Sequence, residues 1–203
     1  MVLITGWFER AFERVIIFEG EYSDDPLDSG GRTKYGITEA VARNFGYEGE
    51  MKDLSLEKAK MIYKKGYWNK NRCDEFASYK MAELVFDCGV NMGNNTAILL
   101  LQRAYNLLSE RGIEEDGLIG PETLNAVNTF KYERDLAFWY LVFRVERYKN
   151  IVKNNSSQRR FIRGWGRRVQ ALMGGILLED TRPNISFAHA LDIVTDKLKE
   201  NIK

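Results

Sequence analysis

The chain has 203 residues, of which 44% are hydrophobic and 29% are charged, and its formal net charge is +1. This composition excludes a globally disordered chain and suits one buried core, or two small cores that share an interface. No run of 18 apolar residues occurs, so we expect no stable membrane insertion.

The first predicted element is a helix over residues 7–18, where apolar residues recur with the helical period. This helix should end near Gly20. Residues 20–38 are polar and rich in glycine, and we expect a loop or small hairpin there, with short β pairing around Tyr22 and Tyr35–Thr38.

Helix-compatible apolar spacing recurs through the rest of the chain, over residues 38–46, 55–68, 76–93, 95–112, 120–130, 133–152, 158–174 and 185–202. Thr38 and Ser55 are candidate N-caps of the first two helices, while Gly112 and Pro121 supply a stop and a start signal. The fold is therefore predicted to be mainly α, with a small β-hairpin or loop after the first helix.

Positive charge is concentrated in residues 144–168, which contain nine lysines and arginines but only one acidic residue, Glu146. Such a stretch can attract a polyanion, either nucleic acid or an acidic cell-wall polymer. The alternative is a solvated helix face without a partner.

Cysteine and histidine are scarce. Cys73 and Cys88 lack the spacing of metal ligands, and His189 is the single histidine, which disfavours a zinc hydrolase. We expect no cofactor and no metal. A peptidase pair of one cysteine with His189 is a further hypothesis, although neither cysteine has a recognisable nucleophile context.

The stretch FEGEYSDDPLDSGGRTKYGIT, residues 18–38, follows the first helix directly. Glu19 would lie in its last turn, where the carbonyl end of the helix dipole and the apolar Phe18 both favour a protonated carboxyl. Such a group can donate its proton to the leaving oxygen of a glycosidic bond, while a second carboxylate stays charged. The loop offers Asp24, Asp25 and Asp28 for that role, unless these acids only solubilise a turn.

This stretch resembles the signature "EGGY…DP.D.GG.T.YGIT" of the glycoside hydrolase family 108 N-acetylmuramidases, a lysozyme-like group found as phage-type endolysins and secretion activator proteins. LSLEKAKMIYKKGYW and ELVFDCGVNMG resemble later segments of this family. LLQRAYNLL…EEDGLIGPETLNAV resembles the peptidoglycan-binding pattern that follows its catalytic part, and FIRGWGRRV resembles its closing "F..GW..R". The matching segments occur in the expected order.

The resemblance implies a lysozyme-like catalytic region over residues 1–92, a helical peptidoglycan-binding-like region over 93–175 and a C-terminal helical extension over 176–203. It implies a muramidase that cleaves the β-1,4 bond between N-acetylmuramic acid and N-acetylglucosamine. A non-catalytic or weakly active wall-binding or secretion-accessory protein is the alternative, because Glu21 stands where the family has glycine.

By this resemblance Glu19 is the general acid, with Glu21 as an alternative acid. Asp28, nine residues later, is the expected second carboxylate, and Asp25 is the runner-up. Thr33 and Thr38 both lie where phage lysozymes use a threonine near the attacking water, and the sequence does not choose between them.

Substrate binding calls for aromatic faces that stack on sugar rings and for amides that bond to N-acetyl groups. The candidates, each of which could instead be a core or capping residue, are Tyr22, Tyr35, Thr38, Tyr67, Trp68 and Asn91. Asp87 either faces the cleft or caps a neighbouring backbone.

The expected partner is peptidoglycan rather than nucleic acid. The N-terminal stretch MVLITGWFERAFERVIIFEG has neither a basic start nor a small-residue cleavage site, so it does not read as a signal peptide. We expect synthesis in a bacterial or phage-infected cytoplasm and action in the periplasm or cell wall. Passage to the wall would then require a holin or a dedicated export system.

Overall fold

The computed structural model describes residues 6–19, 22–23 and 32–177. The predicted helix over 185–202, with His189, lies outside the described residues. The loop acids Asp25 and Asp28, together with Glu21, also lie outside them.

The first helix, α1 (Trp7–Glu19), is confirmed. It buries Phe8, Ala11, Phe12 and Val15, which follow one face at helical spacing. Burial of this face fixes the end of α1, and therefore Glu19, against the rest of the protein.

A small antiparallel sheet follows α1, in the order β1 (Tyr22–Ser23), β2 (Thr33–Lys34) and β3 (Ile37–Thr38). The pairing predicted for Tyr35–Thr38 begins only at Ile37. Tyr35 and Gly36 instead form the turn between β2 and β3, and both have positive φ angles, of 53° and 71°. Because glycine adopts such angles without strain, Gly36 allows this tight reversal.

Both predicted N-caps are confirmed. Thr38 Oγ1 accepts a hydrogen bond from the Val41 N–H at the start of α2 (Glu39–Asn44). Ser55 Oγ accepts one from the Lys58 N–H at the start of α3 (Leu56–Tyr63). α3 then continues into a π-helical turn, η2 (Lys64–Trp68), so the helical span expected to reach residue 68 is present with a wider last turn.

The remaining elements are two short 3₁₀ turns and five α-helices, the last preceded by a third 3₁₀ segment: η1 (Met51–Asp53), η3 (Cys73–Glu75), α4 (Tyr79–Met92), α5 (Asn94–Leu108), α6 (Pro121–Asn128), α7 (Glu133–Asn154), η4 (Ser156–Phe161) and α8 (Ile162–Leu177).

α5 ends at Leu108, before the predicted stop at Gly112. Ser109 is extended, and the Asn106 side chain accepts from the Ile113 N–H and donates to the Ile113 carbonyl, which folds the chain back early. Gly117 has a positive φ of 72°, whereas Gly120 is an ordinary extended residue at the start of α6.

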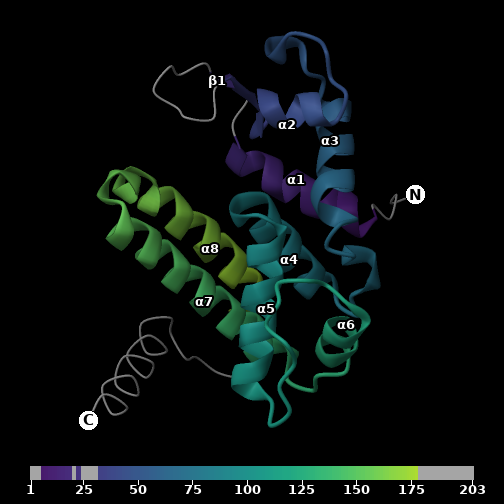
Figure 1. The fold of residues 1–203 in the computed structure, drawn as a ribbon, viewed down its shortest axis with the longest axis vertical. Coiled ribbons are helices and arrows are strands. Elements are labelled where there is room, and N and C mark those ends of the chain that lie inside the picture. Colours follow the sequence, from purple (N-terminus) through teal and green to yellow (C-terminus); the bar gives the residue numbers. More distant parts are fainter. Residues whose placement is uncertain (1–5, 20–21, 24–31, 178–203) are drawn as a thin grey trace.

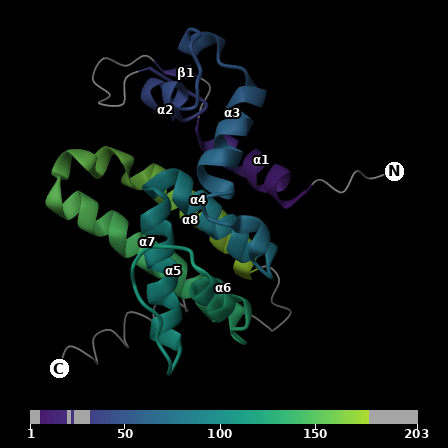
Figure 2. The ribbon, with the colours of Figure 1, turned by 45° about the vertical axis from the view of Figure 1, so that its right-hand side comes forward.

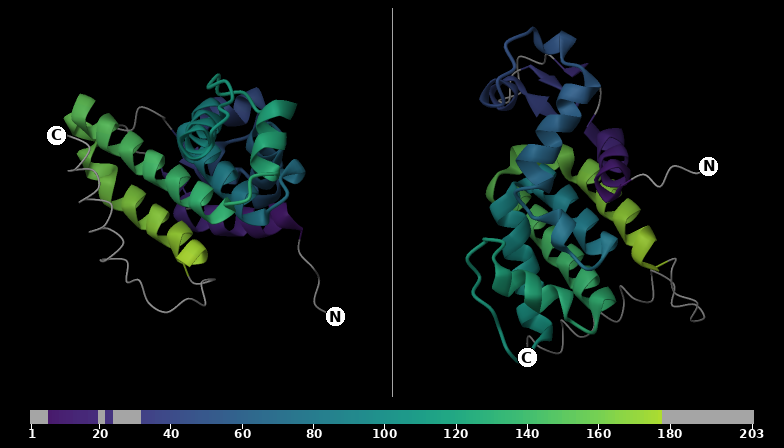
Figure 3. Two further views of the ribbon diagram at one scale, coloured as in Figure 1. Left: turned by 90° about the horizontal axis from the view of Figure 1, so that it is seen from below. Right: turned by 90° about the vertical axis from the view of Figure 1, so that its right-hand side faces the viewer.

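α4 lies at the centre of the fold, where all nine residues from Met81 to Gly89 are buried (Figure 2). It packs against α1, α5 and α7. α7 and α8 form an antiparallel hairpin that lies beside α4 (Figures 1 and 3). The hydrophobic core is continuous from α1 to α8 and passes the predicted boundary near residue 93 without a break.

The prediction of a mainly α, lysozyme-like fold with a small β element after the first helix is confirmed. Among the described helices, none is long and apolar enough to cross a membrane.

Candidate active site

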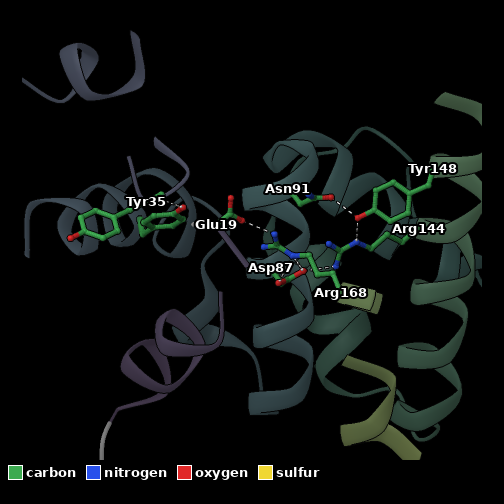
Figure 4. Close-up of polar contacts among 8 residues, drawn as sticks. Glu19, Tyr35, Asp87, Asn91, Arg144, Tyr148 and Arg168 are labelled. Atoms are coloured by element: carbon green, nitrogen blue, oxygen red, sulfur yellow. Dashed lines mark hydrogen bonds and ion pairs between the residues drawn. The ribbon is translucent and has the colours of Figure 1, made fainter. Parts of the chain in front are cut away.

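Glu19 is the last residue of α1, and its side chain is held from two sides. On one side its Oε1 accepts a hydrogen bond from Arg168 Nη1 of α8, at 2.6 Å. On the other side lies Gly36 of the β2–β3 turn, where a Cβ atom would lie 2.9 Å from Glu19 Cδ. Figure 4 shows Glu19 between Tyr35 and Arg168. The side chain is 18% exposed, so solvent still reaches it.

The β2–β3 turn is itself fixed by α3. Tyr63 donates its hydroxyl hydrogen to the Tyr35 carbonyl at 2.8 Å. Burial raises the pKa of Tyr63 well above its usual range, and the negative charge of Glu19 adds to this. Burial and Glu19 also raise the pKa of Tyr67. Both phenols therefore stay protonated near neutral pH, and Tyr63 remains a permanent donor to the turn.

Behind Glu19 lies a buried ionic centre, which consists of Glu19, Asp87, Arg144 and Arg168. Arg168 Nε contacts both carboxylate oxygens of Asp87, at 2.9 and 3.0 Å, and Arg144 Nη1 lies 2.6 Å from Asp87 Oδ1. Burial is the largest influence on both arginines and opposes their charge, but Asp87 and the neighbouring groups together outweigh it, and the pKa of each guanidinium is raised. The centre thus places two guanidinium groups against two carboxyl groups.

Asn91 is connected to the same centre. Its Oδ1 accepts from the Tyr148 hydroxyl, and that oxygen in turn accepts from Arg144 Nε at 3.1 Å (Figure 4). The Tyr148 ring stacks on Trp165 of α8, with ring centroids 4.7 Å apart. These contacts hold Asn91 in a fixed place near Glu19.

A groove of about 440 Å³ opens beside Glu19. Its walls are the last turn of α1, Asn91 of α4, and the face of η4 and α8 that carries Arg160, Trp165 and Arg167. This volume lies within the range typical of small-ligand sites. The carboxyl of Glu19 is therefore available to a bound molecule.

The structure brings together only part of the predicted site. Glu19 and Asn91 line the same groove. Thr33 lies in β2, opposite Thr38 of β3, and Thr38 serves as the N-cap of α2. Tyr35 contributes its backbone to the turn beside Glu19.

Trp68 requires a correction. It is fully buried, with its indole N–H donated to Asp74 at 2.8 Å, so it is a core residue and not a platform for sugars. Asp87 is also buried, where it is the counter-ion of two arginines. It therefore does not face the cleft, which was one of the two expectations for this residue. Tyr22 lies in β1, opposite Lys34, and its role in substrate binding stays a prediction.

The peptidase hypothesis finds no support. Cys73 and Cys88 are both free and fully buried. Burial raises the pKa of each thiol, which leaves neither as a thiolate nucleophile near neutral pH.

Sequence reasoning missed Arg168 and Arg144 as site residues. Both lie in the basic stretch 144–168, where most lysines and arginines are exposed, and composition does not separate buried members from exposed ones. The segment FIRGWGRRV could have indicated Arg168 as a site residue. In it, Trp165 and Arg168 are three residues apart and share one helix face.

Two family models match successive parts of the chain. Residues 12–93 match the family model described as Glycosyl hydrolase 108, and residues 96–170 match the one described as Predicted Peptidoglycan domain. A solved structure titled "Structure of Brucella abortus SagA" is similar, with 28% sequence identity and a TM-score of 0.70. The similarity covers 86% of this chain and 97% of that one. No curated protein matches.

The ionic centre joins the two matched regions, because Glu19 and Asp87 come from the first, and Arg144 and Arg168 from the second. The chain therefore carries a glycosyl hydrolase 108 domain followed by a peptidoglycan domain, the combination of a peptidoglycan hydrolase, and its candidate acid lies beside a groove that both matched regions line.

Proposed function

We propose that this protein is an N-acetylmuramidase that cleaves the β-1,4 bond between N-acetylmuramic acid and N-acetylglucosamine, with Glu19 as the general acid. The observation that carries the proposal is the placement of Glu19. Its carboxyl ends α1, lines the groove and is fixed between Gly36 and Arg168. A catalytic acid must be held within hydrogen-bonding reach of the leaving oxygen, and this fixation supplies the required order.

The two oxygens of Glu19 have different surroundings. Oε1 accepts from Arg168, whereas Oε2 lies toward the Gly36 turn. Because Oε1 is already engaged with a donor, the transferable proton belongs on Oε2. Arg168 would then hold the carboxyl in place as the proton leaves and would balance the charge that develops on it.

The second acid remains Asp28 or Asp25, with Thr33 as the proposed partner of the attacking water. Ser23 of β1 pairs with Thr33 of β2, so both ends of the loop that carries these acids are attached to one small sheet. The same sheet contributes Gly36 beside Glu19. A carboxyl separation of about 6.5–9.5 Å would favour inversion, and one of about 5–5.5 Å would favour a covalent route.

We further propose that the enzyme acts in the periplasm or cell wall, which it reaches through a holin or a dedicated export system. An endolysin and a secretion-accessory wall enzyme both fit this chemistry. Which of the two it is depends on its genetic setting rather than on the site.

The test is hydrolysis of purified peptidoglycan by wild type, Glu19→Gln and Glu13→Gln. Glu13 is exposed on the same helix and serves as the matched control. Because general acid catalysis contributes about 10²–10⁴-fold, Glu19→Gln should lose at least about 100-fold in rate and keep its helical circular dichroism. Glu13→Gln should keep the wild-type rate.

Mass analysis of the released muropeptides identifies the bond. New reducing ends on muramic acid support the proposal, and new ends on glucosamine contradict it. If Glu19→Gln stays active while Glu21→Gln does not, the acid is Glu21. If the wild type binds walls tightly and releases no product, the protein is a non-catalytic wall-binding module.

A further inference from the structure

The wall of the groove formed by η4 and α8 is strongly basic. Arg160 and Arg167 are exposed there, and neither has an acidic partner among the residues that the structure describes. The Arg160 guanidinium lies over the face of Phe161, 4.6 Å from the ring centroid. Glu19 is the one acidic residue in the described lining, and it is already paired with Arg168. The groove therefore has two cationic groups to offer an anion.

A gap separates the two arginines. Gly164 of α8 lies between them in the chain and lines the same groove, and a Cβ atom added there would meet nothing within 4 Å. A ligand can thus approach the helix backbone between the two guanidinium groups. Because Arg160, Gly164 and Arg167 all line the same groove, both arginines can act on one extended ligand.

Aromatic rings complete this wall. Phe161 is 41% exposed and stacks on Trp165 at 5.9 Å between centroids. Trp165 is in turn backed by Tyr148, which holds it rigidly. A wall of this kind suits a ligand that carries both apolar groups and carboxylates, because arginine binds carboxylates through two parallel hydrogen bonds.

We infer that this wall binds the acidic stem peptide attached to the muramic acid beside the scissile bond, with Arg160 and Arg167 as partners of its carboxylates. The inference rests on the proposed muramidase function. The stem is joined to a sugar next to the cleaved bond, so it must lie near Glu19 whenever that bond does.

The test compares two glycan substrates, one with stem peptides and one from which an amidase has removed them. With the full chain, wild type should show a kcat/KM at least about 10-fold higher on the stem-bearing glycan, as expected for two charge-assisted contacts. The double variant Arg160→Gln/Arg167→Gln should bring that ratio close to one. Arg159→Gln/Arg163→Gln is the matched control, because both arginines are exposed on the same elements but do not line the groove.

A second pair of variants blocks the gap without a change in charge. Gly164→Leu should lower the same ratio about 10-fold, since its side chain would fill the space between the arginines. Gly166→Leu is the control, because a Cβ atom there also meets nothing within 4 Å and Gly166 does not line the groove. Neither variant should lower the thermal midpoint, since each replaces a helical glycine in open space.

Equal rates of the wild type on both glycans would overturn the inference and leave the muramidase proposal intact. If the wild type cleaves neither of the two glycans, both the inference and the muramidase proposal are wrong. If the double variant loses binding only to walls that carry phosphodiester polymers, and keeps the wild-type ratio on polymer-free glycan, the anion is a phosphate and the inference is wrong.

Discussion

Two of the buried polar centres among the described residues differ in character. The ionic centre of Glu19, Asp87, Arg144 and Arg168 connects α1, α4, α7 and α8. A second centre, the amide centre, is built on Gln102 of α5, whose side chain bonds to Asp116, Gly117, Leu118 and Thr123. Each one secures distant segments, but only the first includes the candidate acid.

The difference shows what charge adds. Removal of one member of a buried ion pair leaves an uncompensated charge, which costs more than a lost neutral hydrogen bond. Substitutions in the ionic centre should therefore change both the free energy of unfolding and the catalytic rate. Substitutions in the amide centre should change the free energy of unfolding alone. Five predictions test this distinction.

The largest effect is expected for Asp87→Asn. Two buried guanidinium groups would lose their shared counter-ion, which costs about 3–5 kcal/mol in unfolding free energy. Urea denaturation measures this change. A loss below about 1 kcal/mol would mean that water or a rearranged Glu19 replaces the carboxylate, and the ionic centre would then not be a structural unit.

Arg168→Met should cost less stability, about 2–3 kcal/mol, because Arg144 still pairs with Asp87. Its effect on activity should be larger. Loss of the contact to Glu19 Oε1 frees the acid, and misplacement by about 1 Å can cost about 100-fold. We expect a fall in kcat with little change in KM. Arg168→Lys should not restore the rate, since a lysine cannot span both carboxylates. Equal losses in Arg163→Met would argue against a positioning role.

Gln102→Met tests the amide centre. Gln102 is 1% exposed, and its loss leaves the buried Gly117 N–H without its acceptor. We expect a destabilisation of about 1–3 kcal/mol with an unchanged rate per folded molecule. Thermal unfolding and a rate assay at a temperature well below the midpoint separate the two quantities. A lower rate in folded Gln102→Met would show that the two centres are coupled.

Gly36→Ala and Gly117→Ala form a matched pair. Their φ angles are 71° and 72°, and a Cβ atom at either position would crowd a neighbour, Glu19 or the Asn95 carbonyl. Both variants should lose about 1–2 kcal/mol from the left-handed backbone. Only Gly36→Ala should also lose activity, by at least about 10-fold, because it displaces the acid. Similar rates in both variants would show that the turn does not position Glu19.

The smallest effect concerns pH. Hydrogen bonds from Gln102 and from the Leu118 N–H lower the pKa of Asp116 below its usual value. A carboxyl whose pKa is lower in the folded state stabilises the fold above its unfolded pKa, near 4, and this contribution is lost as the pH falls through the folded value. Asp116→Asn should therefore lower the stability at pH 7, where the wild-type carboxylate contributes fully, and flatten the stability profile below about pH 4. An unaltered acid limb in the urea midpoints would contradict this.

The helices were predictable because their signals are local. The apolar face of α1, the N-caps Thr38 and Ser55 and the proline that starts α6 all act within a few residues. The end of α5 was not predictable from its stop glycine, because the Asn106 side chain turns the chain first. Glu19 could be placed at a helix end from sequence alone.

Its partners could not be placed in this way. The contact between Glu19 and Arg168 joins residues 149 positions apart, and no periodicity reports such a pairing. The chemical identity of a residue also does not reveal its burial. Trp68 and Trp165 both looked like aromatic residues of a matched motif, yet the first is in the core and the second lines the groove.

The origin of Arg168 in the region that matches the peptidoglycan domain has a practical consequence for anyone who builds chimaeric lysins from this chain. Exchange of the second region for a foreign wall-targeting module would remove Arg168, the partner of Glu19, and would expose Asp87 to solvent. Recombination should therefore keep residues 6–177 together and attach new modules outside them.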